Sequence, residues 1–442
     1  MKRFALVPSL MIVAAVVCLL FVYLWSSSAP GVALSPEKGL VGARTLSLKL
    51  TARRGLKSVK VSALQGEKRV DLLVKEYRGA KAVEESLPLA QAGLKDGPFT
   101  LEVSAVPVPL LGVPARSSRQ SFSFTYDGTP PVVSVLSVAH NIIRGGAALV
   151  VYTVSKEVEK TGVIIGDRFV PGYRQGGQLY ACLFPFPYDM PPEKYVPRVT
   201  AVDKAGNENS SGINFHLIVK PFSTDRINLT EQLLGKISSE FGSRYPQVKD
   251  PLELFLKVNG ALREENRKAL LDLAKQTSPV PLWQGKDFLR MPKTAPLGGF
   301  AQARTYLYQG REVDHQTHLG FDLASVVQAP VPAANSGKVV FAGDLGIYGQ
   351  CVVIDHGLGL QTVYAHLSRI VVKVGDAVEK GQAVGNTGAT GMAAGDHLHF
   401  GVTVAGVEVN PVEWWDPSWI RNNVSGKLEA ARSAQRGYSS AR

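Results

Sequence analysis

The feature that most constrains this chain is a stretch rich in histidine and glycine, from His315 to Val404. It contains six of the eight histidines in the 442-residue sequence. Two short strings stand out within it, HLGFD at His318–Asp322 and HLHF at His397–Phe400. In a β-strand, residues two or four positions apart point to the same face. We therefore expect each string to present polar groups on one face and apolar side chains on the other.

The spacing of the polar residues favours strands over a helix. His318 and Asp322 are four residues apart, and His397 and His399 are two apart. A helix would also bring the first pair together, but Gly320 and the glycine-rich, β-branched surroundings argue against one. Each string is thus predicted to place its polar residues on a common face.

These residue types are the ones that bind zinc. Zinc is held by histidine nitrogens and carboxylate oxygens, and a catalytic zinc site keeps three protein ligands and one open position. The sequence has no His-Glu-x-x-His helix that would supply a glutamate base. More candidate groups are present than zinc needs, so some are expected to act in acid–base catalysis. The candidates are His318, Asp322, His366, His397 and His399.

The stretch from about Phe300 to Pro411 resembles the lysostaphin/LytM-type zinc metallopeptidases, which cut peptide cross-links in bacterial peptidoglycan. Several motifs carry the resemblance in the order typical of that family. They are His318-x-x-x-Asp322, the region from Gly349 to His356, Tyr364-Ala-His366-Leu, Gly385-Asn-Thr-Gly388 and His397-Leu-His399-Phe400.

The resemblance implies a role for each of the five candidates. It implies that His318, Asp322 and His399 bind zinc, and that His366 and His397 are non-ligand histidines that assist catalysis. It also implies that the substrate is peptidoglycan. Some relatives of this fold have lost zinc and act as envelope scaffolds or as activators of other wall hydrolases. The complete set of five residues favours the enzyme over this alternative.

The N-terminus carries an apolar run that is long enough to cross a membrane. Lys2 and Arg3 precede Phe4–Trp25, whose 22 residues would span about 33 Å as a helix. Positive charges before such a run place the N-terminus in the cytoplasm and the remainder outside it. A cleaved signal peptide is the alternative. We favour a retained single-pass anchor in the inner (cytoplasmic) membrane, with the catalytic domain in the periplasm or outside the cell.

The charge balance restricts the partners of the chain. With 49 Lys and Arg against 37 Asp and Glu, the formal net charge is +12. Basic proteins favour anionic partners such as nucleic acid. No zinc finger or aromatic-basic interleaving is present, so we expect no nucleic-acid partner. An anionic membrane surface or wall polymer fits the same charge. The three cysteines, Cys18, Cys182 and Cys351, form no disulfide framework.

The region before the histidine-rich stretch predicts two β-rich units. Runs such as Leu46–Thr51 and Phe99–Ser104 alternate apolar and polar residues with period two, and turn residues separate them. This pattern is typical of a β-sandwich. In the second unit, Val199–Asn207 resembles the last-strand region of bacterial immunoglobulin-like modules. The two units are interpreted as spacers or as binding modules for an envelope protein or a glycan.

A helical segment is predicted between the β-rich units and the peptidase-like stretch. Asp250-Pro251 is a favourable helix start and Asn259-Gly260 a favourable stop. Ala261–Lys275 carries an amphipathic apolar stripe. We interpret this segment as a packing linker, with a lid over the active site as the alternative. After Trp419 the tail is polar and basic, and we expect it to be flexible.

The predicted fold is mostly β and multidomain, with two tandem β-sandwiches, a short helical linker and a C-terminal β-rich LytM-type peptidase domain. The predicted function is zinc-dependent hydrolysis of peptide cross-links in peptidoglycan. The expected domains are a transmembrane anchor (1–27), a β-sandwich (28–126), an immunoglobulin-like β-sandwich (127–220), a helical linker (221–282), the metallopeptidase domain (283–416) and a flexible basic tail (417–442).

Overall fold

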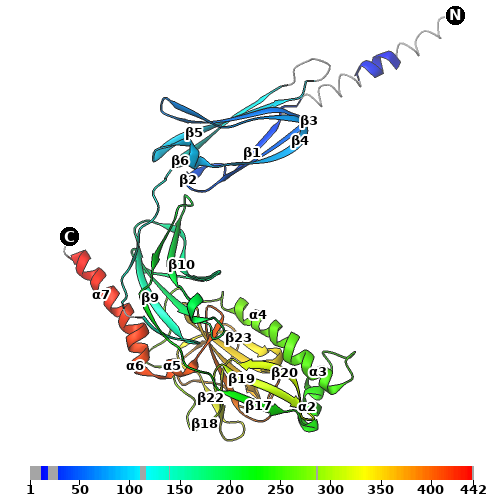
Figure 1. Cartoon of the computed structure of the whole chain (residues 1–442), viewed down its shortest axis with the longest axis vertical. Coiled ribbons are helices and arrows are strands. Elements are labelled where there is room, and N and C mark those ends of the chain that lie inside the picture. The colour runs from blue at the N-terminus through cyan, green and yellow to red at the C-terminus, as the bar shows by residue number, and fades with distance from the viewer. Residues whose placement is uncertain (1–10, 18–27, 110–115, 139, 285–286, 441–442) are drawn as a thin grey trace, which may run out of the picture. The chain divides into compact units, whose positions relative to one another are not determined.

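The structure is a computed structural model that describes residues 11–17, 28–109, 116–138, 140–284 and 287–440, with side chains to residue 433. The chain divides into two compact units (Figure 1). The first comprises Met1–Pro131 with the short segments Glu157–Glu159 and Val202–Asn209. The second comprises Val132–Lys156, Lys160–Ala201 and Ser210–Arg442. The predicted mostly β, multidomain fold is confirmed.

The prediction of a single-pass inner-membrane protein is wrong. Within the described part of the chain, no helix is long and apolar enough to cross a membrane. In this region the structure describes residues 11–17, which are helical. The remainder of the predicted run Phe4–Trp25 lies outside the described residues, as does Cys18.

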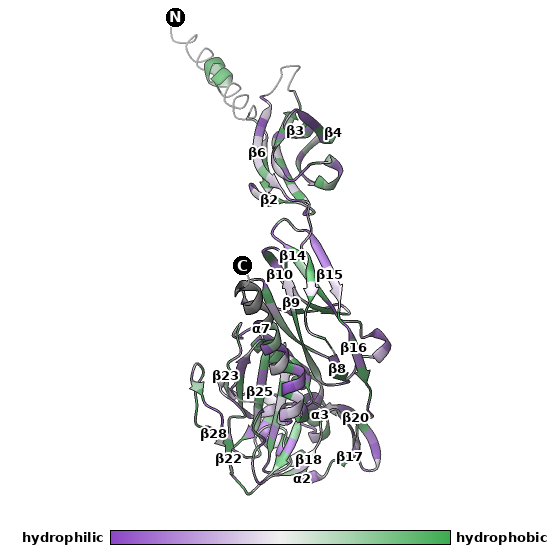
Figure 2. Cartoon of the chain, turned by 90° about the vertical axis from the view of Figure 1, so that its left-hand side faces the viewer, coloured by the Kyte–Doolittle hydropathy of each residue, from purple (hydrophilic) through white to green (hydrophobic). Residues whose placement is uncertain are grey.

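The described residues of the first unit form a six-stranded sheet in the order β1-β3-β5-β6-β2, with β4 paired to β3. Buried and more exposed residues alternate along β5, and Figure 2 shows hydrophobic and hydrophilic residues alternating along this sheet. The period-two pattern predicted these strands because the buried positions form the core of the unit. The strands are β1 (Gly31–Ser35), β2 (Gly39–Val41), β3 (Leu46–Gln65), β4 (Lys68–Leu87), β5 (Gly97–Pro107) and β6 (Ser118–Tyr126).

The region from 133 to 218 is also built from strands. They form two four-stranded sheets, β12-β13-β9-β7 and β11-β10-β14-β15, and a parallel pair, β8 with β16. That the N-terminal half consists of two tandem sandwiches, the second immunoglobulin-like, stays a prediction. The strands are β7 (Val133–Val135), β8 (His140–Ile143), β9 (Ala147–Val154), β10 (Val158–Ile165), β11 (Arg168–Pro171), β12 (Tyr173–Gly176), β13 (Leu179–Pro185), β14 (Arg198–Asp203), β15 (Glu208–Gly212) and β16 (Phe215–Ile218).

The helical segment follows, and it is more continuous than the sequence suggested. Asp250 caps the second helix as predicted, with its Oδ1 accepting the N–H of Glu253 at 2.8 Å. The predicted stop at Asn259-Gly260 is a π-helical turn instead, because the buried Asn259 side chain binds Asp314 at 2.7 Å within helical backbone. The elements are α2 (Glu231–Phe241), α3 (Pro251–Lys257), η3 (Val258–Leu262) and α4 (Arg263–Leu273).

The C-terminal domain contains an eight-stranded sheet in the order β18-β21-β29-β25-β24-β23-β27, with β30 on β29. Two three-stranded sheets, β17-β19-β20 and β22-β28-β26, accompany it. The strands are β17 (Thr224–Asn228), β18 (Ala295–Gly298), β19 (Gln302–Tyr308), β20 (Arg311–His318), β21 (Phe321–Ala324), β22 (Pro330–Pro332), β23 (Gly337–Asp344), β24 (Gln350–Gly357), β25 (Leu360–Leu367), β26 (Arg369–Ile370), β27 (Ala377–Val378), β28 (Ala383–Asn386), β29 (Leu398–Val404) and β30 (Val407–Val409).

The helices α2, α3 and α4 pack on this domain beside β17, β19 and β20 (Figure 1). Leu234 and Ile237 of α2 and Phe255 of α3 share a buried cluster with Tyr306 of β19 and Val363 of β25. The helical segment thus packs against the strands of this domain and shares a hydrophobic core with them.

The tail after Trp419 is helical, so the expectation of a flexible tail is wrong. It follows α5 (Pro411–Trp415) and comprises α6 (Pro417–Ile420), a π-helical turn at Arg421–Ser425 and α7 (Gly426–Ser440). Ile420, Val424 and Leu428 are buried in the core cluster that includes β9. Their spacing of four residues puts them on one helix face, and this narrow apolar stripe is enough to hold the tail.

Candidate active site

The five predicted site residues come together in one place, but His318 and Asp322 do not lie on a single strand as expected. His318 ends β20 and Asp322 lies on β21, so a turn at Leu319-Gly320 separates them. Asp322 lies directly opposite His399 in the antiparallel β21–β29 ladder. Residues paired in this way are close neighbours on one face of a sheet. His366 lies on β25, the other neighbour of β29.

Two imidazoles and a carboxylate converge at the centre of the site. Asp322 Oδ1 lies 3.0 Å from His318 Nε2 and 3.0 Å from His399 Nδ1, and the two nitrogens are 3.0 Å apart. All three side chains are buried. His318 Nδ1–H donates to the carbonyl of Gly299 at 2.9 Å, which leaves Nε2 free to bind a metal. This donor set, with ligand atoms within 4.8 Å of one another, fits zinc.

Two further histidines border this centre. His366 Nδ1–H donates to the carbonyl of Thr390 at 2.9 Å, and His397 Nδ1–H donates to that of Gly395 at 2.8 Å. Each ring therefore has its Nε2 available, and His397 Nε2 lies 3.6 Å from Asp322 Oδ1. The two ring centroids are 4.9 Å apart. His366 has φ of 62°, a left-handed conformation that is costly for a non-glycine residue and recurs at functional sites.

The environment of the site shifts the pKa values of its titratable groups in different directions. Burial alone would raise the pKa of Asp322, but hydrogen bonds from His318, His397 and His399 hold it well below its usual range. Burial lowers the pKa of His366 well below its ordinary value, and His397 and His399 act in the same direction. Burial also lowers the pKa of His397, but the hydrogen bonding and negative charge of Asp322, together with the carbonyl of Gly395, outweigh burial and raise this pKa. Adjacent imidazoles with opposite shifts suit acid–base chemistry.

The sequence prediction missed Arg304, which supports the carboxylate of Asp322. Arg304, on β19, donates from Nη2 to Asp322 Oδ2 at 3.0 Å. A Cβ on Gly298 would lie 2.6 Å from Arg304 Nη2 and 2.9 Å from Asp322 Oδ2, so a side chain there would displace one partner of the ion pair. No local motif marks either residue, because strand pairing alone brings them to the site.

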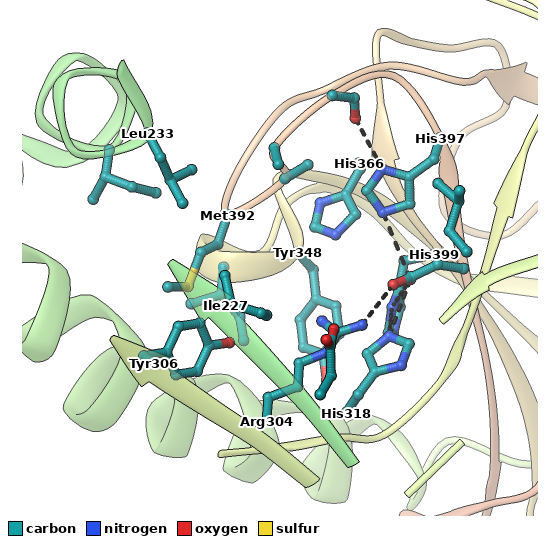
Figure 3. A pocket seen from close by; sticks show the side chains of 18 of the residues that line it. Ile227, Leu233, Arg304, Tyr306, His318, Tyr348, His366, Met392, His397 and His399 are labelled. Carbon is teal, nitrogen blue, oxygen red and sulfur yellow. Dashed lines mark hydrogen bonds and ion pairs between the residues drawn. The ribbon is translucent and has the colours of Figure 1, made fainter. Parts of the chain in front are cut away.

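The histidines line a cavity of about 310 Å³. Figure 3 shows Ile227, Leu233, Tyr306 and Met392 at one end of this cavity and the four histidines at the other. Arg304 and Tyr348 lie between these two groups (Figure 3). The cavity thus joins an apolar end to a polar end that carries the titratable groups, the combination usual in ligand-binding sites.

Helix α2 is hydrogen-bonded to the loop that precedes His397. Lys236 Nζ donates to the carbonyl of Ala389 at 2.7 Å and to that of Ala393, and the N–H of Gly391 donates to Glu240 Oε1 at 2.8 Å. The helical segment therefore lines the cavity, rather than serving only as a linker between domains.

Comparison with known families identifies this part of the chain. The family model for peptidase family M23 matches residues 316–411, which include all five predicted site residues. Residues 316–411 form a peptidase family M23 domain. The resemblance to lysostaphin/LytM-type peptidases expected from the His and Asp motifs is confirmed.

Curated relatives match about a quarter or less of this chain. DD-carboxypeptidase/endopeptidase Mpg of Neisseria meningitidis serogroup B is 41% identical over 95 residues, which are 22% of this chain and 22% of the relative. Peptidoglycan DD-endopeptidase ShyB of Vibrio cholerae is 40% identical over 106 residues, 24% of each chain. The matched segment thus covers less than a quarter of the length of either relative.

Solved structures of similar proteins include two peptidases. A putative peptidase M23 from Pseudomonas aeruginosa is 22% identical, covers 61% of this chain and 93% of its own, and has a TM-score of 0.37. The catalytic domain of lysostaphin from Staphylococcus simulans is 30% identical, covers 27% of this chain and 90% of its own, and has a TM-score of 0.23.

Proposed function

We propose that the M23 domain is a zinc-dependent endopeptidase that hydrolyses peptide cross-links of bacterial peptidoglycan. The observation that carries this proposal is the convergence of His318, Asp322 and His399 on one buried point, with His366 and His397 beside it. The functions of the relatives, DD-endopeptidase among them, support the substrate class. A D,D-peptide bond is therefore the first bond to test.

His318, Asp322 and His399 would hold the zinc ion. When bound, zinc lowers the pKa of a coordinated water toward about 7 and polarises the scissile carbonyl. Asp322 supplies the negative charge of the ligand set, and Arg304 orients its carboxylate through Oδ2. The burial of the three side chains excludes bulk water and strengthens their electrostatic interactions.

His366 and His397 would carry the proton transfers. Their Nδ1–H groups are held by backbone carbonyls, so each ring is fixed with Nε2 as its reactive atom. A neutral imidazole accepts a proton from the attacking water, and a protonated imidazole donates to the developing oxyanion and to the leaving amine. The lowered pKa of His366 favours the neutral form as the acceptor, and the raised pKa of His397 favours the protonated form as the donor.

The test is zinc content together with cleavage of purified peptidoglycan by the full chain. Zinc near one per chain and the release of new free amino groups support the proposal, and mass spectrometry of the fragments identifies the bond. A folded chain with neither zinc nor cleavage would overturn it. That outcome would favour the alternative, an envelope scaffold or an activator of other wall hydrolases.

A further inference from the structure

A second cavity, of about 250 Å³, adjoins the candidate metal site. It shares a wall with the first cavity, because the same residues line both. The shared residues are Arg263, Arg304, His318, Tyr348 and His399. A group bound in the second cavity therefore lies next to the proposed reaction centre.

The lining of the second cavity is strongly cationic. Arg263 and Arg267 reach it from α4 and Arg304 from β19, whereas no described aspartate or glutamate lines it. Arg304 already pairs with Asp322 at 3.0 Å, and Arg267 lies 3.6 Å from Glu408. The cavity thus holds more positive than negative charge.

Arg263 has no anionic partner among the described residues. Its Nη2 donates to Asn259 Oδ1 at 2.6 Å and its Nε to the Asn259 carbonyl at 3.1 Å, both neutral acceptors. Burial lowers the pKa of this guanidinium and the nearby Arg304 acts in the same direction, whereas Tyr306, Tyr348 and Asp314 act against them. A desolvated cation without a carboxylate in direct contact costs free energy, which a bound anion would offset.

The spacing of the two arginines on α4 also favours a bound anion. Arg263 and Arg267 are four residues apart, so both lie on one face of the helix, where two like charges destabilise it. Glu408 offsets part of this repulsion at Arg267, and an anion bound between the two side chains would offset more of it. A guanidinium binds a carboxylate through two parallel hydrogen bonds, which gives such a site both affinity and orientation.

We infer that this cavity binds a free carboxylate of the peptide substrate beside the scissile bond. The inference rests on the proposed function and deepens it, since it names a feature that the substrate must carry. Because the two cavities share lining residues, the carboxylate and the scissile bond can belong to the same substrate peptide. A carboxylate within reach of Arg263 and Arg267 would then belong to a residue near the reacting carbonyl.

Binding and cleavage by the full, zinc-loaded chain test the inference. Calorimetry compares N-acetyl-D-alanine with its amide, which lacks the charge, and cleavage assays compare a cross-linked peptide carrying a free carboxylate next to the scissile bond with its carboxamide analogue. We expect the wild type to prefer the acid about tenfold or more in both assays, the effect of a charge-assisted hydrogen bond. Arg263→Gln should reduce this preference to about threefold or less.

Arg267→Gln and Lys268→Gln complete the design. Arg267 is less enclosed, so its substitution provides a second test should Arg263→Gln fold poorly, and it should also weaken the preference. Lys268 is exposed on the same helix, and Lys268→Gln removes the same charge without touching the cavity, so the preference should survive. Equal binding of acid and amide by the wild type would overturn the inference. So would an unchanged preference in both arginine variants.

Two further measurements distinguish the possible sources of a preference for the acid. A preference that disappears on zinc chelation but survives in both arginine variants comes from the metal and contradicts the inference. Inorganic phosphate that binds more tightly than the acid and depends on Arg263 would identify a phosphate site, which also contradicts it. Acid-selective binding without any cleavage would overturn the proposed function alone, whereas cleavage without acid preference would overturn only the carboxylate site.

Discussion

Arg304 Nη2 and Asp322 Oδ2 lie 3.0 Å apart, and the other oxygen of the same carboxylate faces His318 and His399. The ion pair therefore fixes the rotation of the carboxylate that completes the candidate metal site. Residues that orient metal ligands in this way typically change metal affinity by about 10–100-fold when they are removed.

Arg304→Gln should weaken zinc binding by about 10–100-fold, because Asp322 loses the partner that orients it. Competition with a chromogenic chelator measures this affinity. Arg304→Lys should restore only part of it, since lysine keeps the charge but not the forked geometry. Arg311→Gln, which changes an exposed arginine on β20, is the control and should retain wild-type affinity. Unchanged zinc affinity in Arg304→Gln would contradict this role.

Substitution of the histidines should separate zinc binding from catalysis. His399→Ala should lose zinc, because it removes one of three ligands. His366→Ala should retain zinc and lose about 10²–10⁴-fold in cleavage rate, the usual contribution of an acid–base group. Metal analysis of both purified variants, beside their cleavage rates, checks the pair. Stoichiometric zinc in a folded His399→Ala chain would rule out the ligand assignment.

Adjacent glycines before β19 offer a matched steric test. In Gly298→Ala the new methyl group would lie 2.6 Å from Arg304 Nη2 and 2.9 Å from Asp322 Oδ2, so one side chain must move. We expect weaker zinc binding with little change in overall stability. At Gly299 an added Cβ meets nothing within 4 Å, so Gly299→Ala should bind zinc as the wild type does. Equal zinc affinities in the two variants would show that the carboxylate tolerates displacement.

A buried carboxyl group outside the site should make stability depend on pH. Glu413 Oε2 accepts the N–H of Ala147 at 3.0 Å, and burial raises the Glu413 pKa to about 8. Since this folded-state pKa exceeds the unfolded value of about 4.5, the stabilisation is complete below about pH 4.5 and is lost as pH rises through about 8.

The free energy of unfolding should thus fall by about 3 kcal/mol between pH 6 and pH 9, at ~1.4 kcal/mol for each pH unit up to the folded-state pKa. Urea denaturation at both pH values measures the change. Glu413→Gln mimics the protonated form and should remove most of this fall. Glu379→Gln, at an exposed carboxylate, should leave it in place. A fall of the same size in Glu413→Gln would assign it to other groups.

Local patterns were sufficient to predict several parts of this chain. The alternation along Phe99–Ser104 lies in β5, and the Asp250 cap begins α3. The histidine and aspartate strings also led to the M23 domain that the family comparison finds. Such features depend on spacing along one segment, because strand and helix periodicity and capping are set by neighbouring residues.

Other features depended on contacts between distant segments. An apolar run suggested a membrane anchor, but no helix in the described part of the chain is long and apolar enough to cross a membrane. A polar tail suggested flexibility, yet this segment is helical, and Ile420, Val424 and Leu428 bury it against the core. Hydropathy and composition describe a segment in isolation, whereas its order in the folded protein depends on the residues that pack against it.

The residue types and spacing of the five candidate groups were determined by the sequence alone. Their convergence was decided by the tertiary structure, through the pairing of β21 with β29 and of β25 with β29. Arg304 and Arg263 could be placed near the site only by the structure, because they reach it from β19 and α4 rather than from the motifs. A side chain far along the chain contributes to a site only after strand pairing and helix packing have brought its backbone there.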